Sequence, residues 1–429
     1  MILAGVNKAV FHLQRGRLPS CAAVPFPIQK EPYDMLPEYS AVLLRYGEIG
    51  IKSRQTRRRM VSLLVKHVET ALKEAGVSFS RIRTDFGRVY VETTEAVKVS
   101  QVASRVFGIV STSPVVVTAS NLDTILDVGS AMAVASFTEG RSFAVRASRV
   151  GTHAYSSPDI RERLGERILE KLANFELKVD LKSPAQVVEV EVRDEMAYIF
   201  TETVPGVGGM PMGSQGKVVC LISSGLDSPV AAYKAMKRGC IPVFVTFDDS
   251  PYANEACSGV AVKQAAKLAE YVHDYQVKIY VVPHGADLAD IVSHAPYRMT
   301  CLYCKRNMLR MAREIAVLEN ADALVTGEII GEQASQTSRN LRAIGGVVCD
   351  YPVLRPCIGD DKVDVEHLAA AIGTYQFASE GLSCCTLPPK YPMVRADIDK
   401  VSEAEQGLDL SILKTQVSQA KVVILKEKS

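Results

Sequence analysis

The residues best suited to chemistry lie in a short loop between two apolar segments. Residues 218–222 are apolar, as in a strand, residues 223–228 read Ser-Ser-Gly-Leu-Asp-Ser, and residues 230–236 have the pattern of a helix. Small hydroxyl residues and glycine let a loop backbone approach an anion closely. The N-terminus of the helix behind the loop offers unpaired N–H groups and a positive partial charge. The sequence therefore predicts an anion site in this loop.

The same loop excludes one common phosphate chemistry and indicates another. Asp227 occupies the place where a Walker-A loop carries lysine, and Lys217 is followed by Val218 rather than by serine or threonine. The loop is therefore not a γ-phosphate transfer loop. It resembles the PP-loop, S-G-G-x-D-S, of ATP pyrophosphatases, which split ATP into AMP and pyrophosphate and attach AMP to a substrate oxygen. Ser224 replaces the usual second glycine. The alternative is an ordinary strand–turn–helix crossover.

The segments around the loop must hold it in place, and from residue 217 they alternate between β and α patterns. Strands are predicted at 218–222, 242–246, 278–282 and 323–326, with helices between them. This alternation predicts a parallel, doubly wound α/β sheet, whose ligands lie beyond the carboxyl ends of the strands. Four residues fall at these ends: Ser223, Phe247, His284 and Gly327. The polar segment 326–337 follows the last strand and could close over a nucleotide; the alternative is a plain loop.

The first half of the chain has a different organisation. Residues 1–37 are irregular, and residues 41–46, 54–75, 82 and 89–91 follow a strand–helix–strand–strand pattern that suits a small α+β sandwich. A second α+β unit occupies residues 104–205. Its expected elements are helices near 121–138 and 158–175, and strands near 115–117, 143–146, 187–190 and 197–200. The glycine-rich segment 205–216 is the clearest linker.

Composition limits the class of protein. The 429 residues suggest about three domains. No apolar run reaches the roughly 20 residues that span a bilayer, and the first residues make no convincing signal peptide, so a cytoplasmic location is expected. Ten cysteines in such a chain favour free thiols, metal sites or catalysis over a disulfide framework.

Nucleic-acid binding would need local basic patches, because the net charge is only +2. The candidate patch residues are Arg57, Arg58, Arg146, Arg149, Arg161 and Arg163. The alternative is that these arginines are solvated residues on helix faces.

Cysteine pairs form the second chemical feature. Cys301 and Cys304 are three residues apart and can bind one metal or cluster, and Lys305 and Arg306 beside them could favour thiolates or hold a phosphate. A further pair, Cys384 and Cys385, follows about 80 residues later. Three thiolates from two segments suit an iron–sulfur cluster with one open iron, whereas four suit zinc. The alternative is two unrelated pairs of thiols.

Taken together, these segments resemble the tRNA 4-thiouridine synthetases of the archaeal, cysteine-rich type. The resemblance rests on residues 45–53, 106–109, 143–149, 208–214, 221–233, 325–328 and 334–337. It implies a ferredoxin-like domain (38–103), a THUMP domain (104–205) and a PP-loop ATP pyrophosphatase domain (206–395), after an N-terminal extension (1–37) and before a C-terminal tail (396–429). The fold class is thus an α+β N-terminal region followed by a doubly wound α/β domain. Too few residues follow Pro392 for the rhodanese domain of many bacterial members, which favours sulfur carried on a cluster.

By resemblance, the reaction adenylates the 4-oxygen of a tRNA uridine, expected at position 8, and replaces it with sulfur. The implied cofactors are ATP, Mg²⁺ and an iron–sulfur cluster, 4Fe–4S or 3Fe–4S. Asp227 and Cys385 are the implied catalytic residues. Cluster ligands would be Cys301, Cys304 and Cys385, with Cys384 as the alternative to Cys385. The ATP site would comprise Leu221, Ile222, Ser223, Ser224, Gly225, Asp227, Ser228, Thr246, Phe247, Lys305, Arg306, Gly327 and Gln336.

The implied partners are tRNA and a sulfur donor, either sulfide or a persulfide carrier, and family members are often homodimers. Two competing interpretations stay open at this point. One is another PP-loop enzyme, such as a 2-thiolating one, and the other is a non-catalytic THUMP protein that only binds tRNA. A second role in thiamine thiazole synthesis also fits the resemblance.

Overall fold

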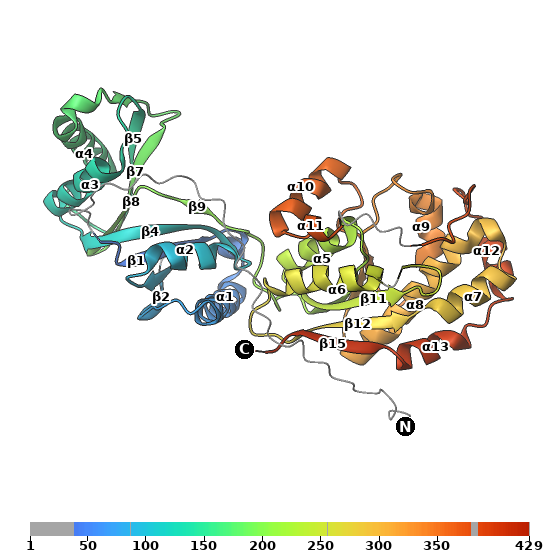
Figure 1. The fold of residues 1–429 in the computed structure, drawn as a ribbon. Helices are drawn as coiled ribbons and strands as arrows, with labels where there is room; N and C mark the ends of the chain where they lie inside the picture. Colours follow the sequence, from blue (N-terminus) through green and yellow to red (C-terminus); the bar gives the residue numbers. More distant parts are fainter. Residues whose placement is uncertain (1–37, 86, 255, 379–384, 429) are drawn as a thin grey trace. The chain divides into compact units, whose positions relative to one another are not determined.

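The computed structural model describes residues 38–85, 87–254, 256–378 and 385–428. The expected N-terminal extension, residues 1–37, lies outside this range. The described residues divide into two compact units, one up to Gly209 and one from Met210 (Figure 1). The division falls inside the glycine-rich segment 205–216, where the sequence predicts a linker.

The N-terminal unit begins with the expected strand and helix. β1 spans Ala41–Tyr46, and α1 spans Arg54–Glu74. The helix forms because Met60, Leu64, Val68 and Leu72 recur at i, i+4 spacing and are buried on one face. It ends just before Gly76, which has φ of +65°, a conformation that glycine adopts without a steric penalty.

One long strand joins the two parts of this unit. β4 (Ile109–Ala119) pairs with β1 through its first half and with β8 (Met196–Phe200) through its second half. The full order is β2-β3-β1-β4-β8-β7-β5-β6, with β9 added beside β4. The other strands are β2 (Arg81–Asp85), β3 (Arg88–Glu92), β5 (Ser142–Val150), β6 (Lys178–Val179), β7 (Gln186–Arg193) and β9 (Val204–Pro205).

Besides α1, three further α-helices accompany these strands in the described part of the unit. α3 (Leu122–Ser136) and α4 (Ser157–Lys171) form where the sequence predicts helices, although α4 ends earlier than expected and a short 3₁₀ turn follows it. α2 (Ala96–Ser104) was not predicted, because it is only nine residues long and its apolar residues resemble a strand. A capping box between Ser156 and Asp159 starts α4.

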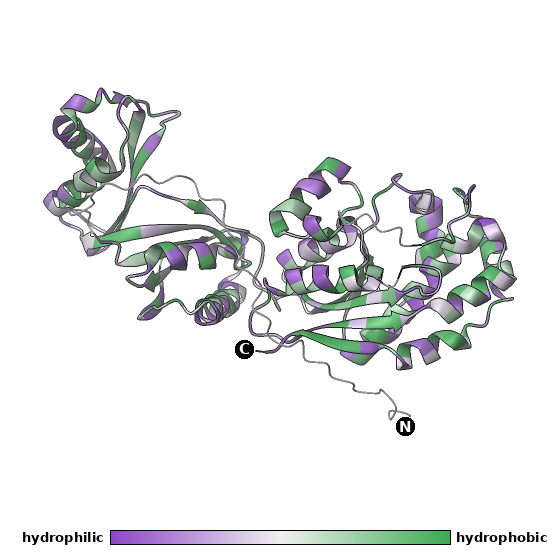
Figure 2. Cartoon of the chain, viewed as in Figure 1, coloured by the Kyte–Doolittle hydropathy of each residue, from purple (hydrophilic) through white to green (hydrophobic). Residues whose placement is uncertain are grey.

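The C-terminal unit has the predicted parallel α/β sheet. Its order is β14-β13-β10-β11-β12-β15, and the first five strands are parallel. The strands are β10 (Lys217–Leu221), β11 (Ile241–Asp248), β12 (Val277–Pro283), β13 (Ala323–Val325), β14 (Val353–Leu354) and β15 (Lys421–Lys426). Figure 2 shows β11 and β12 as largely hydrophobic strands, as expected when both faces of a sheet are covered.

Helices pack on both faces of this sheet. α5 (Asp227–Lys237) and α6 (Ala256–Ala269) lie on one face (Figure 1). α7 (Gly285–His294) and α8 (Thr300–Glu319) pack on the other face, in a core that includes Val219, Tyr280 and Ile315. α9 (Ser338–Gly345) lies between β13 and β14 in the chain, and α10 (Lys362–Ile372) and α11 (Tyr375–Ala378) follow β14.

The segment that the sequence suggests as a C-terminal tail, residues 396–429, folds as part of this unit over its described residues. α12 (Ile398–Glu405) and α13 (Ser411–Ser418) contribute Val401 and Leu413 to the core around α8. β15 then adds an antiparallel strand to the edge of β12. α12, α13 and β15 are each short. They are stabilised by packing against α8 and β12, which lie far away in the sequence, rather than by their own local sequence pattern.

Ion pairs hold α12 against α8. Arg306 binds Glu405 through Nε and Nη2 at 2.8 and 2.6 Å, and Arg310 binds the same carboxylate at 2.7 and 2.8 Å. Burial alone would raise the pKa of Glu405, but the two arginines outweigh it and lower the pKa to about 2. Such charge-assisted, bidentate bonds are strong when they are partly shielded from water.

We expect Glu405→Gln to destabilise the C-terminal unit by about 3 kcal/mol, because two partly buried guanidinium groups lose their counter-charge. The contribution of Glu405 is complete above its unfolded pKa of about 4.3 and is lost as the pH falls toward 2. Chemical denaturation between pH 7 and pH 3 measures both effects. Asp350→Asn is the control, because Asp350 binds Arg313 of the same helix at the exposed surface. Equal losses in the two variants would contradict the prediction.

Candidate functional site

The anion loop follows β10 and leads directly into α5. Ser228 folds it back: the N–H of Ser223 donates to Ser228 Oγ at 2.8 Å, and the two hydroxyl oxygens are 2.9 Å apart. Gly225 N–H donates to Ser223 Oγ at 3.3 Å. Among the described residues, no side chain caps the start of α5. Its first N–H groups and the positive end of its dipole are therefore available to an anion.

Gly327 brings the end of β13 against this helix. A Cβ atom at Gly327 would lie 2.6 Å from both the N and Cα atoms of Ser228, so only glycine allows this approach. Gln336 organises the segment beyond: its Oε1 accepts from Gln333 N–H at 3.2 Å, and its carbonyl accepts from Gly331 N–H. Both residues were predicted at the ATP site, and the structure gives each a part in shaping the loops there.

One pocket collects six of the predicted ATP-site residues at the carboxyl ends of β10 and β11. These are Leu221, Ile222, Ser223, Ser224, Thr246 and Phe247. Sequence reasoning missed the rest of its lining: Asp248, Asp249, Ala253, Asn254, Cys257, Ser258 and Met308. Position beyond a strand end was the signal that could have indicated Asp248 and Asp249.

Asp227 stands at the first position of α5 and binds a residue that the sequence did not indicate. Lys362 Nζ, at the start of α10, lies 2.7 Å from Asp227 Oδ1 and 2.6 Å from Glu332. Burial raises the pKa of Asp227, and the bond from Lys362 opposes this rise. The sequence around Lys362 has no motif that predicts a place in the site. Its position beside the anion loop depends on how α10 packs in the folded protein.

Lys305 and Arg306 were also predicted to bind ATP, and for both this stays a prediction. Arg306 is buried; it binds Glu405 and donates to the carbonyl of Ala343, so its guanidinium has a structural role. Lys305 lies close enough to Cys301 for its charge to oppose the rise that burial causes in the pKa of that thiol. Lys305 is not among the described residues that line the pocket.

The cysteines from the two segments come close together. Cys301 and Cys304 lie in the first turn of α8, where residues three apart share a face. Burial raises the pKa of both thiols, and the charge of Cys385 adds to both effects. Cys384 lies outside the described residues. Within the described residues, no three His, Cys, Asp or Glu side chains are grouped so that they could hold a metal ion. Cysteine sulfur is a suitable ligand for an iron–sulfur cluster. The described residues do not, however, show the three sulfur atoms arranged around one site.

In the N-terminal unit, two of the candidate arginines share a pocket of about 740 Å³ between β5 and α4. Arg146 and Arg161 line it, and Arg146 also forms a long ion pair with Glu189, at 3.5 Å. Arg149 donates to the carbonyl of Gly151 at 3.1 Å. The other three, Arg57, Arg58 and Arg163, are exposed on α1 and α4.

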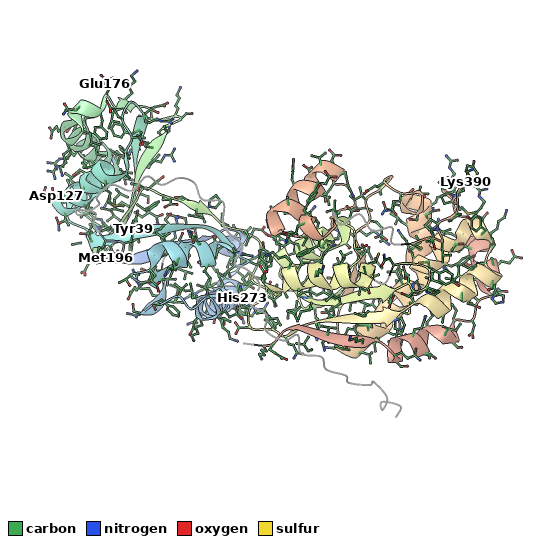
Figure 3. The ribbon with its side chains drawn as sticks, viewed as in Figure 1. Tyr39, Asp127, Glu176, Met196, His273 and Lys390 are labelled. Carbon is green, nitrogen blue, oxygen red and sulfur yellow. The ribbon has the colours of Figure 1, made fainter. Side chains whose placement is uncertain are left out.

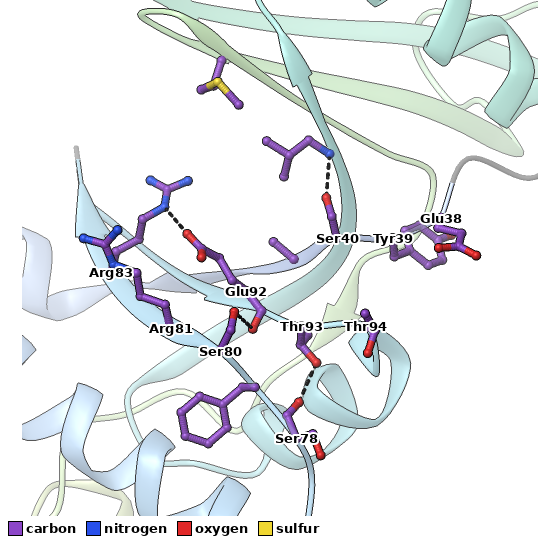
Figure 4. Close-up of a pocket in the computed structure, with 14 residues that line it drawn as sticks. Glu38, Tyr39, Ser40, Ser78, Ser80, Arg81, Arg83, Glu92, Thr93 and Thr94 are labelled. Carbon is purple, nitrogen blue, oxygen red and sulfur yellow. Dashed lines mark hydrogen bonds and ion pairs between the residues drawn. The ribbon is translucent and has the colours of Figure 1, made fainter.

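A second pocket of the N-terminal unit lies beside β2 and β3 and encloses about 810 Å³ (Figure 4). Tyr39 and Met196, both labelled in Figure 3, line it. Its main cation, Arg83, pairs with Glu92 at 3.4 Å and donates to the hydroxyl of Tyr198.

No helix in the described part of the chain is long and apolar enough to cross a membrane.

The fold and the loop define a class. The chain has ferredoxin-like and THUMP-type α+β domains, followed in sequence by a parallel α/β sheet. The first strand of that sheet leads into Ser-Ser-Gly-Leu-Asp-Ser. These features define a THUMP-containing PP-loop protein. Family profiles agree: "Thiamine biosynthesis protein (ThiI)" matches residues 213–410, "ThiI ferredoxin-like domain" matches 41–113, and "THUMP domain" matches 119–202. The expected fold class is confirmed.

Whole-chain comparisons identify the family. A relative from Methanosarcina mazei, named "Probable tRNA sulfurtransferase", is 36% identical over 90% of this chain and 96% of its own. One of the same name from Methanosarcina acetivorans is 36% identical over 87% and 91%. The solved "4-thiouridine synthetase - RNA complex with bound ATP" matches 91% of this chain and 100% of its own with a TM-score of 0.80 and 29% identity. The chain belongs to the ThiI family of tRNA sulfurtransferases.

Proposed function

We propose that this protein is an ATP-dependent tRNA sulfurtransferase that converts a uridine, expected at position 8, to 4-thiouridine and releases AMP and pyrophosphate. The observation that carries the proposal is the loop 223–228, folded back by Ser228 over the uncapped start of α5, in a chain of this family. The uracil 4-oxygen is a poor leaving group. Its transfer to the α-phosphorus of ATP makes AMP the leaving group.

The residues of the nucleotide site have distinct parts in this proposal. The loop and the N–H groups of α5 bind phosphate, and Thr246 and Phe247, near the carboxyl end of the adjacent strand β11, line the pocket. Asp227 helps to organise Mg²⁺ and the phosphates. Lys362, now bound to Asp227 and Glu332, can neutralise the charge that develops as pyrophosphate leaves.

Similarity to a solved 4-thiouridine synthetase supports modification at the 4-position over 2-thiolation. A non-catalytic tRNA-binding protein would not need the polar contacts of the loop. Thiolation at the 4-position, with sulfide or a persulfide carrier as the sulfur donor, is therefore the function that the site supports best.

We propose that Cys301, Cys304 and Cys385 hold an iron–sulfur cluster, because Cys385 is near enough to affect both thiols of α8 and soft sulfur donors suit such a cluster. A bound cluster of this kind would offer one open iron able to carry sulfide. The exposed arginines of the N-terminal unit are proposed to contact tRNA phosphates, since folded RNA is recognised largely by shape and backbone charge.

Asp227→Ala and Lys362→Met should each lower 4-thiouridine formation about 100-fold or more, while tRNA affinity stays within about 3-fold. Each variant removes charge at the phosphate site without touching the N-terminal unit. Nucleoside analysis of tRNA incubated anaerobically with ATP, Mg²⁺ and sulfide measures the product. Lys234→Met is the matched control, because Lys234 of the same helix α5 pairs with Asp360. Full thiolation by Asp227→Ala would refute the PP-loop assignment.

Reversal of both Arg146 and Arg149 to glutamate should weaken tRNA binding. The slope of log Kd against log salt should fall by about 1 for each phosphate group that the variant no longer binds. Filter binding across a salt series measures both quantities. Arg167→Glu serves as the control, because Arg167 already pairs with Asp127 on α3. Unchanged affinity together with an unchanged slope would show that this patch does not bind tRNA.

Protein purified without oxygen should be brown, with broad absorption near ~400 nm and with iron and labile sulfide. Cys301→Ala, Cys304→Ala and Cys385→Ala should each lose both the colour and thiolation, whereas Cys384→Ala should matter less. Cys349→Ala is the control, because Cys349 is an exposed free thiol. A colourless, fully active wild type with stoichiometric zinc would overturn the cluster proposal.

A further inference from the structure

A buried histidine is fixed between two aspartates beside the nucleotide pocket. His284 Nδ1 lies 2.7 Å from Asp249 Oδ1, and Nε2 lies 2.9 Å from Asp287 Oδ2. Both ring nitrogens therefore face carboxylate oxygens, which only accept hydrogen bonds. Since a neutral imidazole carries one N–H, this geometry favours the doubly protonated ring when both aspartates are ionised. Burial would lower the pKa of His284, but the two aspartates outweigh it and raise the pKa to about 8.

We call Asp249, His284 and Asp287 the ion triad. Its Asp287 end is buried inside the C-terminal unit. His284 is fully buried and Asp287 is 2% exposed. Asn307 Nδ2 donates to the other oxygen of Asp287 at 2.7 Å, and Arg310 donates to Asn307 Oδ1 at 2.7 Å. Arg310 in turn binds Glu405. The imidazolium is thus held by a continuous hydrogen-bonded chain that reaches α12.

The near side of the triad opens on the pocket. Asp249 follows β11 directly and lines the same pocket as Ser223 and Ser224 of the anion loop. Its side chain is 19% exposed, and its Oδ2 makes no hydrogen bond with any residue that the structure describes. Cys304 lies near enough for the charge of Asp249 to contribute to the raised pKa of that thiol. Among the described residues, Asp249 thus has one bonded and one unbonded carboxylate oxygen, and it neighbours both the nucleotide loop and Cys304.

We propose that Asp249 is a catalytic base that accepts the N3 proton of the target uracil, and that His284 is the positioning residue that aims it. This assignment rests on the proposed function. As the proton moves to Asp249 Oδ2, the N3–H electron pair forms an N3=C4 bond and the C4=O4 pair moves onto O4. O4 then attacks the α-phosphorus, and pyrophosphate leaves with the broken Pα–O pair. The proton returns to N3 when sulfur displaces AMP, because 4-thiouridine carries hydrogen at N3.

This role explains why a charged group is buried here. A hydrogen bond in which the donor is ionised is shorter and stronger than a neutral one, so the imidazolium holds Asp249 more firmly than a neutral donor would. Asp287 binds the other ring nitrogen, so the imidazole is held on both sides and Asp249 keeps one orientation. Removal of the proton as O4 attacks is general base catalysis, which typically contributes about 10²–10⁴-fold to a rate.

The test compares Asp249→Asn, His284→Gln and wild type in tRNA-dependent AMP formation. Asp249→Asn should lower kcat about 100-fold or more, with the KM for ATP changed by less than about 3-fold. His284→Gln should lower kcat about 10-fold. The matched control is His294→Gln on the same helix α7, where an exposed histidine pairs with Asp290; it should retain the wild-type rate.

A substrate change separates a base from a structural residue. Synthetic tRNA with 5-fluorouridine at the target position has a more acidic N3–H, so it needs less help from a base. It should restore Asp249→Asn by about 10-fold or more while changing the wild-type rate little. Asp249→Ser supplies the same comparison if Asp249→Asn does not fold.

Three results would overturn the assignment. They are a wild-type rate in Asp249→Asn, a loss confined to ATP affinity, and an absence of recovery with 5-fluorouridine. A wild type that forms neither AMP nor 4-thiouridine with any tRNA would overturn the proposed function and this assignment with it. An active wild type beside an equally active Asp249→Asn variant would overturn this assignment alone.

Discussion

The contact between Gly327 and the first turn of α5 constrains the rest of the C-terminal unit. The backbone after β13 can approach Ser228 only because residue 327 has no Cβ atom. This close approach sets the separation of the loops that follow β10 and β13, two neighbouring strands of the parallel sheet. The segment 328–337 therefore begins directly beside the start of α5, next to the anion loop.

A chain of ionic and polar groups extends from that pocket through the unit. It runs from Asp249 through His284, Asp287, Asn307 and Arg310 to Glu405. Buried charges are costly unless each has its partners, and here successive groups provide them. The C-terminal segment therefore supports the site from a distance, because α12 supplies the carboxylate that ends the chain. The role of α12 is to hold α8 in place, together with the side chains on α8.

The N-terminal unit uses a comparable device to join its two parts. β4 runs through both, and Glu191 from β7 lies beside Arg45, Arg88 and Arg193 at 3.1, 3.4 and 2.9 Å. Burial would raise the pKa of Glu191, but the three arginines outweigh it and keep the carboxylate charged. Partly buried hydrogen bonds from Arg45 and Arg193 to this one carboxylate tie β1 and β7, which belong to the two parts of the unit, to each other.

The sequence by itself determined the features that depend on neighbours along the chain. The spacing of Met60, Leu64 and Val68 gave α1, the β/α alternation gave the parallel sheet, and the order of residues 223–228 gave the loop. Only the tertiary structure decided that Lys362 reaches Asp227, that Arg306 binds Glu405, and that residues 421–426 add a strand to the sheet. Periodicity and turn chemistry act over a few residues. The partner of a charged side chain is chosen by the packing of segments far apart in sequence, which no local pattern encodes.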